Sequence, residues 1–111
     1  MNITESNDGG ITVFTLDGRA DTQGAVDLDM MLQAAVAEGK HKMVLDLAEL
    51  KYISSSGLRT LADVLTRNKE AGGDLKLAAV NRKILRVLQI VGFDKFFSIY
   101  ESVDQATADF K

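Results

Sequence analysis

Two hydrophobic patterns with different periods meet in the middle of the chain. Residues Met43–Leu47 are apolar at four of five positions, which is typical of a strand covered on both faces. From position 58 onward the apolar residues recur at the spacing of an amphipathic helix, at positions 58, 61, 62 and 65. Its polar face carries Arg59, Asp63 and Arg67. Asp63 precedes Arg67 by four residues, and an acid four positions before a base is the favourable order for an ion pair on a helix. The pattern predicts a buried strand, a short connection, and a helix that begins within Ser54–Gly57.

The residues before this central region predict two strands and a helix. The turn sequence Asn7–Gly10 separates a short edge strand, Ile3–Glu5, from a second strand that Asp17–Gly18 ends. We expect Phe14 on one face of this second strand and the other apolar residues on the opposite face, at positions 11, 13 and 16. A helix follows, with Asp21 or Thr22 as its cap, Gly39 as its stop, and an apolar stripe at positions 28, 31, 32, 35 and 36.

The residues after the central helix predict two more strand and helix pairs. Gly72–Gly73 ends the central helix, and a strand then shows apolar residues at positions 75, 77, 79 and 80. Asn81 caps a third helix that Gly92 ends, and a last short strand lies at Ile99–Tyr100. Ser102–Gln105 matches a capping box and begins a terminal helix through position 110. We expect the phenylalanines at positions 93, 96 and 97 to pack in the core, the alternative being that one of them lies exposed as a contact.

This order of elements determines the expected fold class. Strands alternate with helices after the opening hairpin, and such alternation requires crossover connections between parallel strands. The sequence therefore predicts an α/β fold with a mixed, mostly parallel sheet of about four to five strands and about four helices. At 111 residues, the chain is expected to form a single domain over residues 1–111.

The composition restricts the location and the kind of partner. Hydrophobic residues make up 46% of the chain and charged residues 26%, with a net charge of −3 and no cysteine. The negative charge argues against nucleic acid, and no apolar run has the length of a membrane span. Residues 1–5 contain neither the basic region nor the apolar core of a signal peptide. We expect a cytoplasmic protein that does not insert into a membrane.

The residue types that common enzymes need are sparse. The only histidine, His41, precedes the buried strand, which places it roughly 15–20 Å from the serines at the other end of that strand. A serine–histidine nucleophile is therefore not expected. Asp21, Asp27 and Asp29 read as a cap and a solvated helix face rather than metal ligands, and no phosphate-binding glycine motif is present. We expect a protein that is not an enzyme and that holds no metal or cofactor.

The serine triplet Ser54–Ser56 permits two interpretations. One serine can cap the helix while its neighbours fill turn positions, which requires no function. Alternatively, one serine accepts a phosphate, because the start of a helix has unpaired N–H groups and favours negative charge. Phosphorylation would add about −1.5 to −2 charges at one point of the surface and could thereby disrupt a protein contact.

The residues around the triplet also resemble those of a known family. The segment Val44–Leu47, followed after four residues by Tyr52–Leu58, resembles the signature of the STAS domain family, and of its bacterial anti-sigma factor antagonists in particular. Gly18–Asp21 is similar to the family's Gly-x-x-Asp, and Asn81–Gly92 with the following Phe93 is similar to its late helix. The resemblance covers nearly the whole chain.

The resemblance implies a partner-switching mechanism. An unphosphorylated antagonist of this family binds an anti-sigma factor that is also a serine kinase; phosphorylation ends binding, and a serine phosphatase restores it. Alignment on Gly57 places the phosphoacceptor at Ser55, with Ser56 the second choice, and Asp21 nearby. The implied partner-binding residues are Asp21, Ser54, Ser55, Ser56, Gly57 and Arg59. The sequence departs from the family at Ser54, where an aspartate is usual.

Two alternatives remain at this stage. The chain could be a STAS module without phosphorylation, acting as a scaffold subunit or as a partner in lipid transport. A small-molecule or nucleotide binder has no phosphate-binding motif in its support. The acceptor serine at the helix start favours the phosphorylation switch, and the sequence leaves the oligomeric state open.

Overall fold

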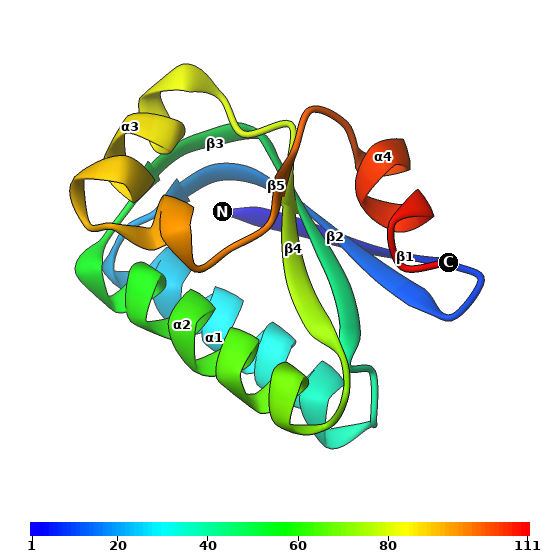
Figure 1. Ribbon diagram of the computed structural model, residues 1–111. Helices are drawn as coiled ribbons and strands as arrows, with labels where there is room; N and C mark the ends of the chain where they lie inside the picture. Colours follow the sequence, from blue (N-terminus) through cyan, green and yellow to red (C-terminus); the bar gives the residue numbers. More distant parts are fainter.

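Five strands form one mixed sheet in the order β1-β2-β3-β4-β5, shown in the computed structural model of residues 1–111 (Figure 1). Only β1 and β2 are antiparallel, and each later neighbour is parallel. The α/β class and the element order are as the sequence predicts. None of the helices is long and apolar enough to cross a bilayer. The elements are β1 (Asn2–Asp8), β2 (Ile11–Ala20), α1 (Thr22–Ala37), β3 (Lys42–Ile53), α2 (Ser55–Glu70), β4 (Asp74–Ala78), α3 (Arg82–Ile90), η1 (Phe93–Lys95), β5 (Ile99–Tyr100) and α4 (Val103–Ala108).

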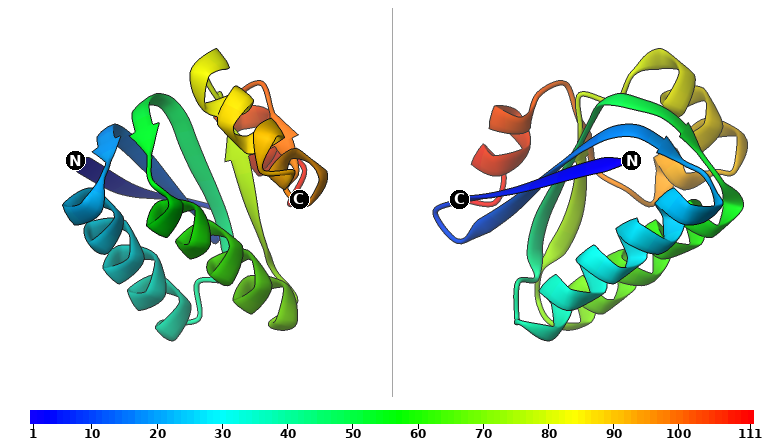
Figure 2. Two further views of the ribbon diagram at one scale, coloured as in Figure 1. Left: turned by 90° about the vertical axis from the view of Figure 1, so that its left-hand side faces the viewer. Right: turned by 180° about the vertical axis from the view of Figure 1, so that it is seen from behind.

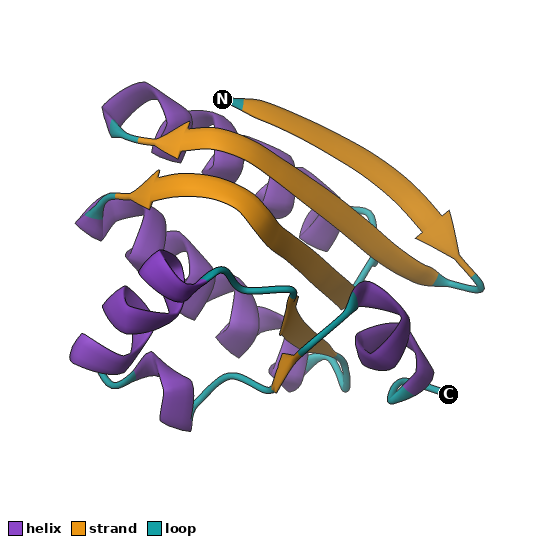
Figure 3. Ribbon diagram, turned by 90° about the horizontal axis from the view of Figure 1, so that it is seen from above, coloured by secondary structure: helices purple, strands orange, loops and turns teal.

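The two faces of the sheet are covered by different helices. Helices α1 and α2 run side by side across one face, and α4 lies against the other (Figures 2 and 3). The larger core, with Leu32 of α1 and Leu61 of α2, lies between the sheet and α1, α2 and α3. A smaller cluster joins Val44 of β3 to Ala106 of α4. Because both faces are covered, β3 begins as the continuous apolar run that the sequence shows.

The assignment of residues to the two faces of β2 needs one correction. Leu16 packs with Phe14 in the larger core, whereas Ile11 and Val13 belong to the cluster under α4. Side chains of a strand alternate between faces, so Leu16 shares a face with Phe14 and not with Val13.

Both central strands are longer than predicted. Strand β2 does not end at Asp17–Gly18 but continues to Ala20, and β3 continues beyond Leu47 to Ile53, so the expected connection is part of the strand. Register shifts between β2 and β3, at Thr15/Asp17 and Gly18/Arg19, bend the ribbon without ending the pairing. Irregular pairing disrupts the alternation of apolar and polar residues, which is why the sequence pattern suggests an earlier end.

Smaller corrections concern β4 and the phenylalanines. Strand β4 ends at Ala78, and Ala79 then takes a positive φ of 53° as the chain leaves the sheet. Phe97 is buried and its ring lies 5.6 Å from that of Phe93, but Phe96 is 66% exposed. Phe96 and Phe97 are adjacent in the chain just after the turn η1, and with Phe97 directed into the core, Phe96 points to solvent.

A buried lysine connects the C-terminal helix to the sheet. Lys76 of β4 is 6% exposed, and its Nζ lies 3.0 Å from the hydroxyl of Tyr100 and 3.3 Å from Oδ2 of Asp109. The hydroxyl of Tyr100 also donates a hydrogen bond to Asp109. Burial acts to lower the pKa of Lys76, but these contacts outweigh it and raise that pKa. The hydrogen bonds from Tyr100 and Lys76 lower the pKa of the Asp109 carboxyl.

This contact predicts a dependence of stability on acid pH. A carboxyl group whose pKa is lower in the folded state stabilises the fold above its unfolded pKa of about 4, and this stabilisation is lost as the pH falls further. We therefore expect the Asp109→Asn variant to be less stable than wild type near neutral pH, with the difference shrinking below about pH 4. Urea unfolding of both proteins over this range measures the difference. A constant difference at every pH would contradict the assignment.

Candidate functional site

The starts of α1 and α2 lie side by side at one edge of the sheet. Ala20 and Ile53, the last residues of β2 and β3, are paired, and the N–H of Ser54 donates to the carbonyl oxygen of Ala20 at 2.8 Å. Asp21, which follows β2, caps α1, and Ser54, which follows β3, caps α2. Asp21 Oδ1 accepts from the N–H of Gly24 at 3.0 Å, and Ser54 Oγ accepts from the N–H of Gly57 at 3.2 Å. Asp21 therefore lies beside the serines.

A glycine allows each helix to start close to the strand before it. A Cβ on Gly24 would lie 2.3 Å from the carbonyl oxygen of Arg19, and one on Gly57 would lie 2.8 Å from Cγ1 of Ile53. Gly57 is buried, as are Ala20 and Ile53 around it. Both glycines thus fix how near the two helix starts come to the sheet, and Gly57 acts through packing rather than as an exposed contact.

The three serines have different environments. Ser54 is half-buried and its hydroxyl is used as the cap, whereas Ser55 and Ser56 are exposed. The N–H groups of Ser54 and Gly57 already have acceptors. The other two unpaired donors expected at a helix start are the N–H groups of Ser55 and Ser56. The capping interpretation therefore holds for Ser54, and it leaves two exposed serines with no structural role in the helix start.

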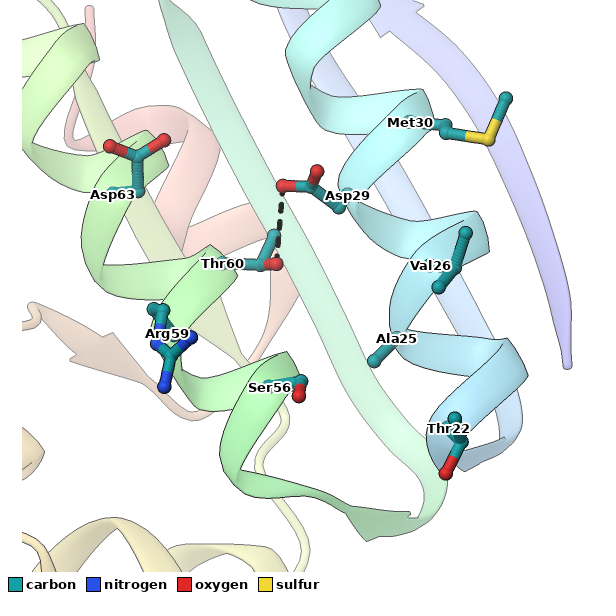
Figure 4. Close-up of a pocket in the computed structure, with 9 residues that line it drawn as sticks. All are labelled: Thr22, Ala25, Val26, Asp29, Met30, Ser56, Arg59, Thr60 and Asp63. Carbon is teal, nitrogen blue, oxygen red and sulfur yellow. Dashed lines mark hydrogen bonds between the residues drawn. The ribbon is translucent and has the colours of Figure 1, made fainter.

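A groove between α1 and α2 extends from Ser56 along both helices (Figure 4). It has a volume of about 470 Å³. Val26 and Met30 on α1 line it and are 48% and 67% exposed. On the opposite side, the hydroxyl of Thr60 donates to Oδ1 of Asp29 at 3.2 Å, which ties the two helices together. The groove combines exposed apolar side chains with polar groups, as protein-binding surfaces do.

Val26 and Met30 were not predicted as site residues. The sequence contains a signal for them, because they are four residues apart and lie off the buried stripe of Leu28, Leu32 and Ala35. Two apolar residues at helical spacing outside a buried stripe form an exposed patch. Their connection to the serines depends on the pairing of α1 with α2, which the sequence pattern does not specify.

The charges near the serines are unevenly distributed. The first turn of α2 has no acidic residue. Arg59 is exposed, lines the groove, and forms none of the ion pairs of the chain, which use Lys40, Lys51, Arg67, Lys76 and Lys111. Further along α2, Nε of Arg67 binds Oδ2 of Asp63 at 3.1 Å, as predicted. The edge at the serines therefore has an unpaired cation and a helix N-terminus, both of which favour an anion.

The structure places the only histidine away from this edge. His41 precedes β3 and its Nδ1 lies 3.3 Å from Oδ1 of Asn68, near the end of α2. Ser54 follows the other end of β3, so the expected separation of His41 from the serines is confirmed. No group of three histidine, cysteine, aspartate or glutamate residues has the arrangement of a metal site. The chemistry available at the serines is that of exposed hydroxyls, backbone donors, the guanidinium of Arg59 and the carboxylate of Asp21.

Sequence comparison gives a single consistent family. The family model described as "STAS domain" matches residues 2–106. "Putative anti-sigma factor antagonist BtrV" of Bordetella bronchiseptica is 33% identical over 111 residues, which is 100% of this chain and 96% of that protein. Anti-sigma-F factor antagonist RsfB of Mycobacterium tuberculosis is 25% identical over 108 residues, covering 96% of this chain and 86% of RsfB.

Solved structures agree with the sequence comparison. The structure of an anti-sigma factor antagonist from Mycobacterium paratuberculosis has a TM-score of 0.88 and 25% identity, and the match covers 97% of this chain and 92% of that one. The structure of SpoIIAA, an anti-sigma factor antagonist, in its unphosphorylated form has a TM-score of 0.77 at 14% identity, covering 97% and 96%. At that identity the second match supports the fold alone.

Proposed function

The chain belongs to the STAS domain family, and from this premise we propose that it is an anti-sigma factor antagonist whose binding surface is switched off by phosphorylation. The observation that carries the proposal is the pair of exposed serines, Ser55 and Ser56, at the start of α2. They lie beside Asp21, and Ser56 and Arg59 line the groove, so a phosphate at this helix start would add negative charge next to the groove. The whole chain, residues 1–111, acts as a single STAS domain that binds proteins and does not catalyse a reaction.

Ser55 is the proposed phosphoacceptor and Ser56 the second choice. Modification of Ser54 would esterify the oxygen that accepts from the N–H of Gly57 and crowd this cap, and a helix cap contributes about 1 kcal/mol. A phosphate on Ser56 would enter the groove, which already contains the carboxylates of Asp29 and Asp63. Ser55 avoids both costs. Its phosphate would lie at the positive end of the helix dipole, so the fold would tolerate the modification.

The replacement of the family's usual aspartate by Ser54 is compatible with this proposal. Ser54 Oγ makes the capping hydrogen bond, so the helix start keeps its geometry without a carboxylate. What changes is the charge, because the first turn of α2 has no acidic group. The proposed partners are a serine-kinase anti-sigma factor and a serine phosphatase. The anti-sigma factor binds the unphosphorylated surface through Asp21, Ser54–Ser56 and Arg59, with Gly57 supporting this surface from below by packing, and the phosphatase restores the surface.

Phosphopeptide mass spectrometry of the protein isolated from its native host, with and without stress, tests this function. We expect a single phosphate on the peptide that contains Ser54–Ser56, at Ser55, with an occupancy that changes between the two conditions. Fragmentation that separates positions 55 and 56 assigns the acceptor. A well-expressed protein whose peptide is unmodified under every condition would contradict the switch and favour a constitutive scaffold or transport-partner role.

A further inference from the structure

We propose that Arg59 is the intramolecular partner of the phosphate on Ser55, so that phosphorylation also withdraws this cation from the binding surface. The inference rests on the proposed function, since it concerns the same serine. It adds a second effect to the switch. The phosphate introduces negative charge, and at the same time it engages a guanidinium that the unphosphorylated protein offers to its partner.

The spacing along α2 is the first support. Ser55 and Arg59 are four residues apart, with the acceptor on the N-terminal side, which is the favourable order for an acidic group and a base on a helix. The same helix contains a formed pair with this spacing and order. Asp63 and Arg67 are in contact at 3.1 Å while both remain about half exposed. A phosphate on Ser55 would have the same position relative to Arg59 that the carboxylate of Asp63 has relative to Arg67.

The availability of Arg59 is the second support. It is the residue of this polar face without a partner, since its side chain takes part in no ion pair. Asp63 lies four residues after Arg59, but Oδ2 of Asp63 is already bound by Arg67 and by Nε2 of Gln33 at 2.7 Å. An ion pair between Arg59 and Asp63 would also place the base before the acid, which is the less favourable order on a helix.

The direction of the side chain is the third support. Figure 4 shows the guanidinium of Arg59 extending along the helix toward its first turn, while Ser56 projects from the other side of the helix into the groove. This is the usual direction, because side chains of a helix lean toward its N-terminus. The planar guanidinium can donate two hydrogen bonds to phosphate oxygens at once, a geometry that a lysine cannot reproduce.

The experiment measures the phosphate directly and needs neither kinase nor partner. Phosphoserine is incorporated at position 55 of the full chain during translation, and the second pKa of the phosphate is determined by ³¹P NMR titration. A guanidinium next to the phosphate favours the dianion and lowers this pKa. We expect the Arg59→Gln variant to raise it by about half a unit relative to the unsubstituted chain. Arg59→Lys is expected to restore part of the difference.

Lys69→Gln is the matched control, because it removes the same charge from an exposed side chain near the far end of α2 that forms no ion pair. We expect it to leave the phosphate pKa unchanged. Equal pKa values with and without Arg59, or equal shifts in both variants, would overturn the inference. The two claims can fail independently. In the NMR experiment the phosphate is placed on Ser55 by translation, so it tests only the contact with Arg59, whereas the mass spectrometry tests whether the host phosphorylates the protein.

Discussion

Replacing Gly24 by alanine is expected to destabilise the protein by about 2–3 kcal/mol, a large part of the 5–15 kcal/mol typical of a domain. The added Cβ would lie 2.3 Å from the carbonyl oxygen of Arg19, so the start of α1 must move away from the end of β2. Alanine favours the helix over glycine by about 1 kcal/mol, which offsets only part of this cost. The loss is measured as a lower midpoint of urea unfolding.

Gln23→Ala is the matched control, because Gln23 is exposed on the same turn. Its expected effect is within about 0.5 kcal/mol of zero. Gly57→Ala should lie between the two, since its Cβ would meet the side chain of Ile53, which can shift, instead of a backbone carbonyl. Gly57→Val adds two methyl groups at this contact and should approach the effect of Gly24→Ala. Equal stabilities for Gly24→Ala and Gln23→Ala would show that a Cβ at position 24 fits between the start of α1 and the end of β2, and would contradict the prediction.

The sequence predicted the order of elements because most of them have local signals. The cap residues Ser54 and Asn81 each precede an apolar stripe at helical spacing, and both cap their helices in the structure. The full lengths of β2 and β3 could not be predicted, because the bulges near Asp17 and Gly18 break the alternation on which a strand prediction depends. Longer strands matter here, since their common end brings Asp21 next to Ser54.

The candidate site was predictable in part for the same reason. Ser55 and Ser56 lie four and three residues before Arg59, which is about one helix turn, so their proximity follows from the helix itself. The groove is different, because Val26 and Met30 approach α2 only through the packing of two helices. Phe96 likewise required the structure, since its exposure depends on how the turn η1 enters the core. Contacts between distant segments are set by packing, which local patterns do not determine.

The second large effect concerns binding to the proposed partner, an anti-sigma factor. We expect Ser55→Asp to weaken this binding about tenfold, which corresponds to about 1.4 kcal/mol, and a phosphate on Ser55 to weaken it about a hundredfold. The aspartate supplies about one charge and the phosphate about −1.5 to −2, and both would lie beside Asp21 at the start of α2. Ser55→Ala should keep wild-type affinity while it removes the acceptor.

A control variant must show whether the loss of binding depends on where the negative charge is added or only on its being added. Thr66 is exposed on the same side of α2, three turns beyond Ser55, so Thr66→Asp adds the same charge outside the proposed surface. We expect it to change the dissociation constant less than twofold, whereas the loss in Ser55→Asp should shrink as added salt screens the repulsion. Isothermal titration calorimetry at two salt concentrations measures both. If Ser55→Asp bound as tightly as Ser55→Ala at low salt, charge at this position could not be what releases the partner.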